Sequence, residues 1–200
     1  MDETELRIAY ESHDGVQTLI DQLQYSLEAI SLSFDRWGEQ YVKGPGMYIA
    51  VVTGPSIAAF ADPMGRNQWP TDRCRSVEHD CETFVEAAQD VALTRDGAVV
   101  VGVDGVVETQ MVRFTGGMPN DLDSGETAAP TYEDWMGSRH MSALDMSTLD
   151  DVIATVTLSQ ESGRVTVCED GTFESQPREA LGGRWRVEAA VETSVPSEQP

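Results

Sequence analysis

Two short groups of residues in this chain carry side chains suited to binding phosphate and a metal ion. In the first, the carboxylate of Asp96 is followed by Gly97 and Ala98, whose small size lets a ligand approach the backbone closely. In the second, residues 137–140 place several hydrogen-bond donors together, and an arginine among them can hold phosphate oxygens through two parallel hydrogen bonds. Together the two groups predict nucleotide chemistry.

The second group begins with Gly137, and each later member has its own expected part. Arg139 would hold phosphate oxygens, His140 would add a donor, and Ser138 would offer its amide and hydroxyl at the N-terminus of a helix. Nucleotidyl transfer depends on neutralising charge around the phosphates, through such donors and through a divalent ion held by carboxylates. We therefore expect Asp96 to bind that ion.

A third group, Ser159 and Glu161, follows another apolar run and offers a further donor and a second carboxylate. Taken singly, none of the three groups is specific. Asp-Gly pairs are common in the turns of hairpins. An Arg-His pair more often begins a solvated helix than binds phosphate, and Ser159 and Glu161 are residue types that are common in turns. Their occurrence together, each beside a predicted strand or helix, favours one functional site.

In their order along the chain, the three groups resemble the motifs of the diadenylate cyclase family, and the likeness covers roughly residues 96–171. The family's elements are Asp-Gly-Ala, Gly-Thr-Arg-His-Arg and Ser-Glu-Glu-x-Gly. The matching segments of this chain are Asp96-Gly97-Ala98, Gly137-Ser138-Arg139-His140-Met141 and Ser159-Gln160-Glu161-Ser162-Gly163. Together with the acidity described below, they are similar to family members from halophilic archaea.

The resemblance implies a homo-oligomer in which two protomers face each other, each with one ATP and a divalent ion, Mg or Mn. The 3′-hydroxyl of each ATP then attacks the α-phosphate of the other, which yields cyclic di-AMP and releases two pyrophosphates. By position, the implied site residues are Asp96 for the metal and the 3′-hydroxyl, Gly97 and Ala98 for backbone contacts to the nucleotide, Gly137, Ser138, Arg139, His140 and Ser159 for the phosphates, and Glu161 as the second metal ligand.

Two residues depart from the family pattern. Met141 replaces the second arginine of the middle motif, which removes a fixed positive charge, and Gln160 replaces the first glutamate of the last motif. A substitute donor could come from Arg164 or from a partner protomer. These departures leave open a catalytically impaired nucleotide-binding regulator on the same fold. An acidic α/β interaction protein that binds no nucleotide is a third alternative.

Three cysteines are present, and two of them raise the question of a zinc site. Cys74, His79 and Cys81 lie close together in the chain, but a fourth ligand is missing and the spacing matches no common zinc finger. An odd number of cysteines does not fit a disulfide framework. We therefore expect reduced thiols.

The residues before Asp96 predict helices and strands that would help to position the site. Apolar residues recur at helical spacing over 16–34, with Asp14 as a possible cap and Gly38 as a stop. The other elements expected here are a second amphipathic helix over 81–92, a buried strand over 47–52 and a candidate pairing partner for that strand over 57–61.

Beyond Asp96 the pattern changes mainly to strands. Asp104-Gly105 predicts a type I′ turn between strands over 98–103 and 106–114. Residues 115–131 are rich in Gly, Pro, Asp and Asn and predict a long loop. The elements expected after it are a helix from Arg139 toward Leu144, strands over 153–158 and 165–169, and a turn at Asp170-Gly171.

Helices that alternate with apolar strands and two hairpins predict an α/β fold, a single domain with a central mixed β-sheet flanked by helices, as the resemblance to diadenylate cyclases also implies. We divide the chain into three parts. These are N-terminal helices and strands over 1–95 that belong to the same domain, a catalytic core over 96–186, and an acidic flexible tail over 187–200.

The chain is strongly acidic, with 35 Asp and Glu against 13 Lys and Arg and a formal net charge of -22. At molar salt the screening length falls to roughly 3 Å, which removes repulsion between neighbouring carboxylates, so we expect a protein from a salt-rich cytoplasm. Binding to nucleic acid needs a basic face. No apolar run reaches the ~18 residues of a spanning helix. We therefore expect a cytoplasmic protein that binds neither nucleic acid nor membrane.

Overall fold

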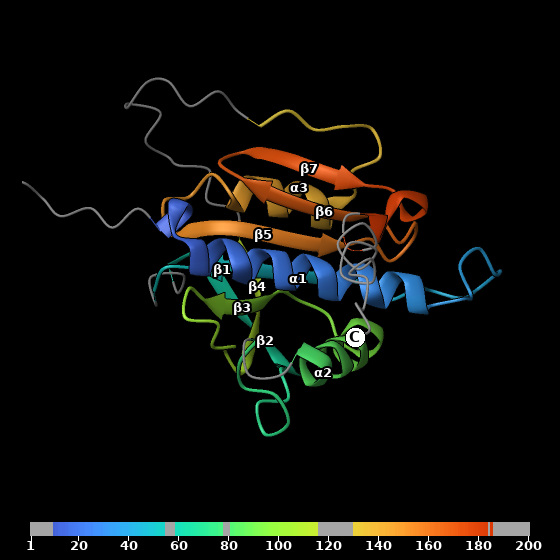
Figure 1. The fold of residues 1–200 in the computed structure, drawn as a ribbon, viewed down its shortest axis with the longest axis horizontal. Coiled ribbons are helices and arrows are strands. Elements are labelled where there is room, and N and C mark those ends of the chain that lie inside the picture. The colour runs from blue at the N-terminus through green and yellow to red at the C-terminus, as the bar shows by residue number, and fades with distance from the viewer. Residues whose placement is uncertain (1–9, 55–58, 78–80, 116–129, 184, 186–200) are drawn as a thin grey trace, which may run out of the picture.

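A five-stranded mixed β-sheet forms the centre of the structure (Figure 1). The computed structural model describes residues 10–54, 59–77, 81–115, 130–183 and 185. The strands of the central sheet are β1 (Met47–Val52), β3 (Val99–Gly102), β5 (Val152–Leu158), β6 (Val165–Glu169) and β7 (Thr172–Gln176). Their order is β3-β1-β5-β6-β7, and only the β1–β3 pair is parallel within this sheet.

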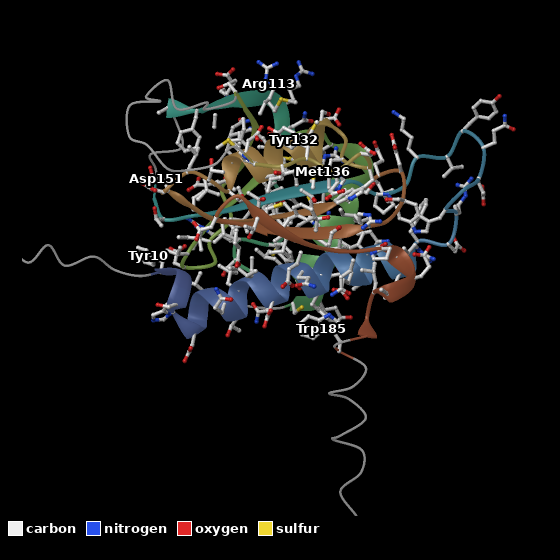
Figure 2. All side chains as sticks on the ribbon, turned by 90° about the horizontal axis from the view of Figure 1, so that it is seen from above. Tyr10, Arg113, Tyr132, Met136, Asp151 and Trp185 are labelled. Atoms are coloured by element: carbon white, nitrogen blue, oxygen red, sulfur yellow. The ribbon has the colours of Figure 1, made fainter. Side chains whose placement is uncertain are left out.

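Helices cover this sheet on both sides. α1 (Asp14–Ser33) and α2 (Cys81–Thr94) pack against one face, whereas α3 (Ser138–Met146) packs against the other. Figure 2 shows the two sides: Trp185 lies on the α1 side, and Tyr132 and Met136 lie on the α3 side. The predicted fold class, a central mixed sheet flanked by helices, is therefore confirmed.

β1 is buried along its whole length because it has a core on each face. Met47, Ile49 and Val51 join the core formed with α1 and α2. The alternate residues of the strand, beginning with Tyr48, join the core formed with α3. A strand buried on both faces has no polar positions, so it reads as an unbroken apolar run. The predicted bounds of this strand are confirmed.

The predicted first helix is present as α1, but its cap differs from the expectation. His13 is the N-cap, and its Nδ1 accepts a hydrogen bond of 3.2 Å from the amide of Gly15. The expected cap at Asp14 is wrong, because Asp14 is already helical. The helix ends at Ser33, before the expected stop at Gly38, since the backbone is extended at the next residue.

A second, two-stranded sheet pairs β2 (Ala61–Gln68) with β4 (Gln110–Phe114). The expected pairing of residues 57–61 with β1 is wrong for Ala61, which pairs with Phe114, and β1 has β3 and β5 as its neighbours. The remaining expected residues up to 58 lie outside the described part. The sequence gives no strand signal here, because β2 contains proline and glycine and is largely exposed.

The chain reverses at the predicted Asp104-Gly105 pair, but the turn is not type I′. Of these two residues only Gly105 has a positive φ, of 75°. Its amide donates to the carbonyl of Gly102 at 2.8 Å, which fits a type I turn followed by a left-handed glycine. The expected long hairpin is also interrupted, because β4 pairs with β2 and meets the β3 segment through isolated bridges such as Ala98 with Val112.

The predicted turn at Asp170-Gly171 is confirmed and joins β6 to β7. Both residues have positive φ angles, 49° and 68°, as a type I′ turn requires. β7 was not predicted as a strand, because its polar sequence lies at an edge of the sheet and is not fully buried. The predicted helix near Arg139 is present as α3, and the predicted strands over 153–158 and 165–169 are present as β5 and β6.

The expected loop over 115–131 lies largely outside the described residues, and the expected tail over 187–200 lies wholly outside them. Among the helices of the described residues, none combines the length and the apolar character that a membrane crossing requires.

Candidate functional site

A pocket of about 500 Å³ opens at the place where the three sequence groups meet. This volume falls within the range of small-molecule sites, which is roughly 300–1,000 Å³. Its lining comes from β1, β2, β4, α3, the β3 entry and the turn after β5. The residues are Tyr48, Met64, Gly97, Ala98, Val112, Arg113, Phe114, Trp135, Gly137, Ser138, Arg139, His140, Ser142, Ser159, Gln160 and Glu161.

Eight of the nine residues singled out from the sequence line this pocket; Asp96 does not. Asp96 is exposed, and it lies close enough to Arg139 for its charge to oppose the effect of burial on the pKa of that side chain. Three segments far apart in the chain are therefore brought together around one cavity. Asp96 stands beside this cavity rather than in its wall.

Arg139 lies in the first turn of α3 and is partly buried. Burial lowers the pKa of its guanidinium, and the charge of Asp96 acts in the opposite direction. The guanidinium packs against Gly46, where an added Cβ would lie 2.5 Å from Nη1 of Arg139 and 2.9 Å from Cβ of Gln160. Gly46 therefore makes room for the arginine, a role that the sequence analysis missed.

The side chain of His140 is buried, with 6% of its surface exposed. Its Nε2 has no hydrogen-bond partner although it is fully enclosed. Burial, followed by the positive charges of Arg139 and Arg164, lowers the pKa of the imidazole to about 4. His140 is therefore neutral at neutral pH, and its enclosed Nε2 is a polar atom without a hydrogen-bond partner in this structure.

We expect the protein to lose stability as the pH falls below the ordinary histidine pKa of 6.5, because the folded state keeps His140 neutral. Between pH 6.5 and about pH 4, His140 is protonated in the unfolded chain but stays neutral in the folded chain. The contribution of His140 to the free energy of unfolding is fully present above pH 6.5 and is lost as the pH falls toward 4. The loss is about 3 kcal/mol. Urea unfolding at about pH 7.5 and about pH 4.5 measures the loss. His140→Gln should show a smaller fall, and an equal fall in both proteins contradicts the prediction.

The N-terminus of α3 faces the pocket through Gly137 and Ser138. Gly137 is the N-cap and supplies no side-chain hydrogen bond to the first turn. The first amides of a helix lack intrahelical partners and carry a partial positive charge, so they attract anions. Combined with Arg139, this helix end makes one half of the pocket suitable for phosphate.

Gly97 has a φ of 106°, in the left-handed region where side chains are strained. An added Cβ there would lie 3.0 Å from Cγ of Met64 and 3.0 Å from the carbonyl oxygen of Val112. The next amide, that of Ala98, donates to this same carbonyl at 2.7 Å. The N–H of Ala98 is therefore already used within the protein, and the expected contact of this segment with a nucleotide stays a prediction.

Ser159 and Glu161 belong to a tight turn after β5. The hydroxyl oxygen of Ser159 accepts hydrogen bonds from the amides of Glu161 at 3.4 Å and Ser162 at 3.3 Å. The carbonyl of Gln160 accepts a bond of 3.1 Å from the amide of Gly44. The hydroxyl of Ser159 thus holds the turn, and the exposed carboxylate of Glu161 is presented at the pocket.

Ser31 of α1 tethers the far end of this turn. Its buried hydroxyl donates to the carbonyl of Gly163 at 2.7 Å. Ser31→Ala should lower the free energy of unfolding by about 1–3 kcal/mol, because it leaves a buried carbonyl without a partner. Urea unfolding measures the effect. The matched control is Ser33→Ala, which removes an exposed hydroxyl from the same helix end and should cost far less. Equal costs for the two variants contradict the assigned tether.

The other half of the pocket is apolar and was not identified from the sequence. Its surfaces come from Tyr48, Met64, Val112 and Phe114, and the rings of Tyr48 and Phe114 lie 5.5 Å apart. The hydroxyl of Tyr48 donates to the carbonyl of Ser142, and burial raises its pKa. A pocket with one apolar and one cationic half can hold a ligand that joins a flat apolar group to an anion.

Asp96 and Glu161 are the two carboxylates from which the sequence predicts a metal site. No group of three or more His, Cys, Asp or Glu side chains that could hold a metal exists among the described residues. Mg²⁺ is usually bound through one or two carboxylates together with water and substrate phosphates, and Asp96 and Glu161 offer that number. The zinc question raised by Cys74, His79 and Cys81 is not tested, because His79 lies outside the described residues. Cys74 donates to the carbonyl of Ser76 at 3.4 Å.

Solved structures with a similar fold are known. A double-cysteine mutant of DacA from Staphylococcus aureus is 15% identical to this chain, with a TM-score of 0.50, and the match covers 88% of this chain and 95% of that chain. A hypothetical membrane-spanning protein from Bacillus cereus is also 15% identical, with a TM-score of 0.48 over 80% of this chain and 62% of that chain. No family model and no curated protein matches the sequence. At this identity the likeness to DacA concerns the fold alone.

Proposed function

We propose that this chain is a diadenylate cyclase that condenses two ATP molecules into cyclic di-AMP and releases two pyrophosphates. The observation that carries the proposal is the pocket in which Arg139, the buried neutral His140 and the N-terminus of α3 meet the Gly97 and Ser159 segments. Its support from comparison is the fold shared with DacA, a diadenylate cyclase. The apolar half of the pocket would take the adenine, and the cationic half would take the triphosphate.

In this reaction each residue would act on a defined part of ATP. Arg139 and the first amides of α3 would neutralise the phosphate oxygens, and His140 would add a donor once neighbouring side chains open a path to its enclosed Nε2. Asp96 would orient the 3′-hydroxyl, and Glu161 would join it as a metal ligand. When bound, Mg or Mn would neutralise charge on the phosphates as pyrophosphate leaves.

One pocket holds one ATP, so the reaction would require two protomers facing each other. The 3′-oxygen of each ATP would form a bond to the α-phosphorus of the other as the bond to the β-phosphate oxygen breaks. The two hydroxyl protons would pass to solvent. A homo-oligomer is therefore part of the proposal, as are a salt-rich cytoplasm and the absence of nucleic acid and membrane partners.

A nucleotide-binding regulator without catalysis is the second candidate, and one feature favours it. Met141 places an apolar side chain, 36% exposed, on α3 next to His140, where a diadenylate cyclase is expected to carry a cation. A weaker positive field would lower the rate more than the binding of ATP. This regulator would bind ATP and form no cyclic product.

The test is incubation of the purified protein with ATP and Mn²⁺ or Mg²⁺ in molar KCl, followed by mass spectrometry for cyclic di-AMP. We expect product from the wild type and a large loss in Asp96→Asn. Asp150→Asn, which removes an exposed carboxylate away from the pocket lining, is the matched control and should retain activity. ATP binding without product would favour the regulator. The absence of both would leave the interaction protein as the remaining alternative.

A further inference from the structure

Trp135 forms part of the pocket wall and is the centre of a stack of side chains. The guanidinium carbon of Arg164 lies 4.5 Å from the centre of the indole ring. The rings of His140 and Phe173 approach the same indole edge-to-face, at 5.2 Å and 5.9 Å between ring centres. The indole is thus held by three neighbours, and Arg164 and His140 both contact it.

Arg164 is held in place from its other side. Its Nη1 donates to the hydroxyl of Ser175 at 3.2 Å, and this hydroxyl is itself 2.8 Å from that of Thr166 on the neighbouring strand. No carboxylate pairs with Arg164 among the ion pairs of the described residues. Its positive charge is therefore fixed in position and is not cancelled by a nearby acid within that part of the chain.

Arg164 does not itself line the pocket. It would therefore act on a ligand indirectly, through Trp135 and His140, which do line it. A cation over an indole face is attracted by the ring and limits its motion. An uncancelled charge behind a protein wall also acts over several ångströms when little water intervenes. Both effects would reach the cationic half of the pocket.

We propose that Arg164 is a positioning residue of this pocket, which fixes Trp135 and His140 and adds positive potential to the phosphate half without touching the ligand. The naming of that ligand as ATP rests on the proposed function. The stack of Arg164, Trp135 and His140 is observed in the structure and does not depend on which ligand binds. The role differs from that of Arg139, whose guanidinium is in the pocket wall.

The charges around His140 agree with this assignment. Arg164 and Arg139 both act to lower the pKa of the imidazole, after burial. Two acidic groups are placed near this site among the described residues: Asp96 acts on Arg139, and Glu161 lines the pocket. Removing the charge of Arg164 should therefore make His140 easier to protonate.

The experiment compares Arg164→Met, Arg164→Lys and Ser175→Ala with the control Arg73→Met, which removes an exposed arginine paired with Asp90. The first measurement is an NMR titration of the His140 ring without nucleotide, its signal identified by its loss in His140→Gln. We expect Arg164→Met to raise the pKa of His140 by about half a unit, and Arg164→Lys and Arg73→Met to leave it near the wild-type value.

The second measurement is the dissociation constant for ATP with Mg²⁺. We expect about a 3- to 10-fold weakening in Arg164→Met, about a threefold weakening in Arg164→Lys because stacking is lost, and about twofold in Ser175→Ala. Ser175→Ala keeps the arginine and tests the tether if Arg164→Met does not fold. A pKa and an affinity in Arg164→Met that match those of Arg73→Met overturn the proposal. If wild type binds no ATP but the His140 titration moves as expected, the proposed function fails and the positioning role stands.

Discussion

Gly46→Ala is expected to reduce cyclic di-AMP formation about 10- to 100-fold in a protein that remains folded. The added methyl group would lie 2.5 Å from Nη1 of Arg139, so the guanidinium must leave its place. The arginine side chain can move away at small cost, whereas Cβ of Gln160, at 2.9 Å, is fixed to its backbone, so we also expect a modest loss of stability. Hydrogen bonds to charged groups are worth about 1.5–3 kcal/mol, and their loss corresponds to about one or two powers of ten.

The measurement is the rate of product formation together with a thermal unfolding curve. Gly54→Ala is the control, because an added Cβ there meets no atom within 4 Å. Arg139→Met should show at least as large a loss as Gly46→Ala. If Gly46→Ala keeps full activity while Arg139→Met loses it, then the glycine does not position the arginine.

Gly97→Ala is expected to lower the free energy of unfolding by about 1–3 kcal/mol and also to weaken ATP binding. A φ of 106° is strained for any residue with a Cβ. The new methyl group would press on the carbonyl of Val112, a backbone atom that cannot rotate away, and on Met64. Either shift changes the wall of the pocket.

Urea unfolding and ATP titration measure the two effects of Gly97→Ala. The control is Gly183→Ala, at a glycine with no strained φ and no atom within 4 Å of the added Cβ. Unfolding curves that coincide for Gly97→Ala and the wild type would show that the backbone accepts a side chain here, and the strain argument would fail.

The elements that the sequence predicted well are those whose signal is local. β1 and β5 are buried throughout because both of their faces are covered, so β1 is an apolar run and β5 is interrupted only by Thr155 and Thr157. α1 shows helical periodicity because only one of its faces is buried. β2 and β7 were not predicted as strands, because their strand conformation depends on pairing with a neighbouring strand. The turn at Asp104-Gly105 was located correctly, but its type depends on the φ of Asp104, which residue identity alone does not determine.

The candidate site shows the same division. The motifs around Gly97, Arg139 and Ser159 were recognised from their order, and these segments line one pocket. Gly46 and Ser31 were missed because they act through contacts with residues far away in the sequence. Arg164 was considered as a replacement donor, but its stacking on Trp135 follows only from the folded arrangement.

The position of β1 at the centre of the sheet has a consequence for the order in which the protein is made. Its neighbour β3 begins at Val99 and its other neighbour β5 only at Val152, so both partners leave the ribosome well after β1 itself. At about 5–20 residues per second, the wait for β5 lasts roughly 5–20 s. During that interval an apolar strand lacks one of its two partners. Contacts of such long sequence separation also form slowly. Chaperones that shield apolar segments during synthesis would therefore benefit this chain.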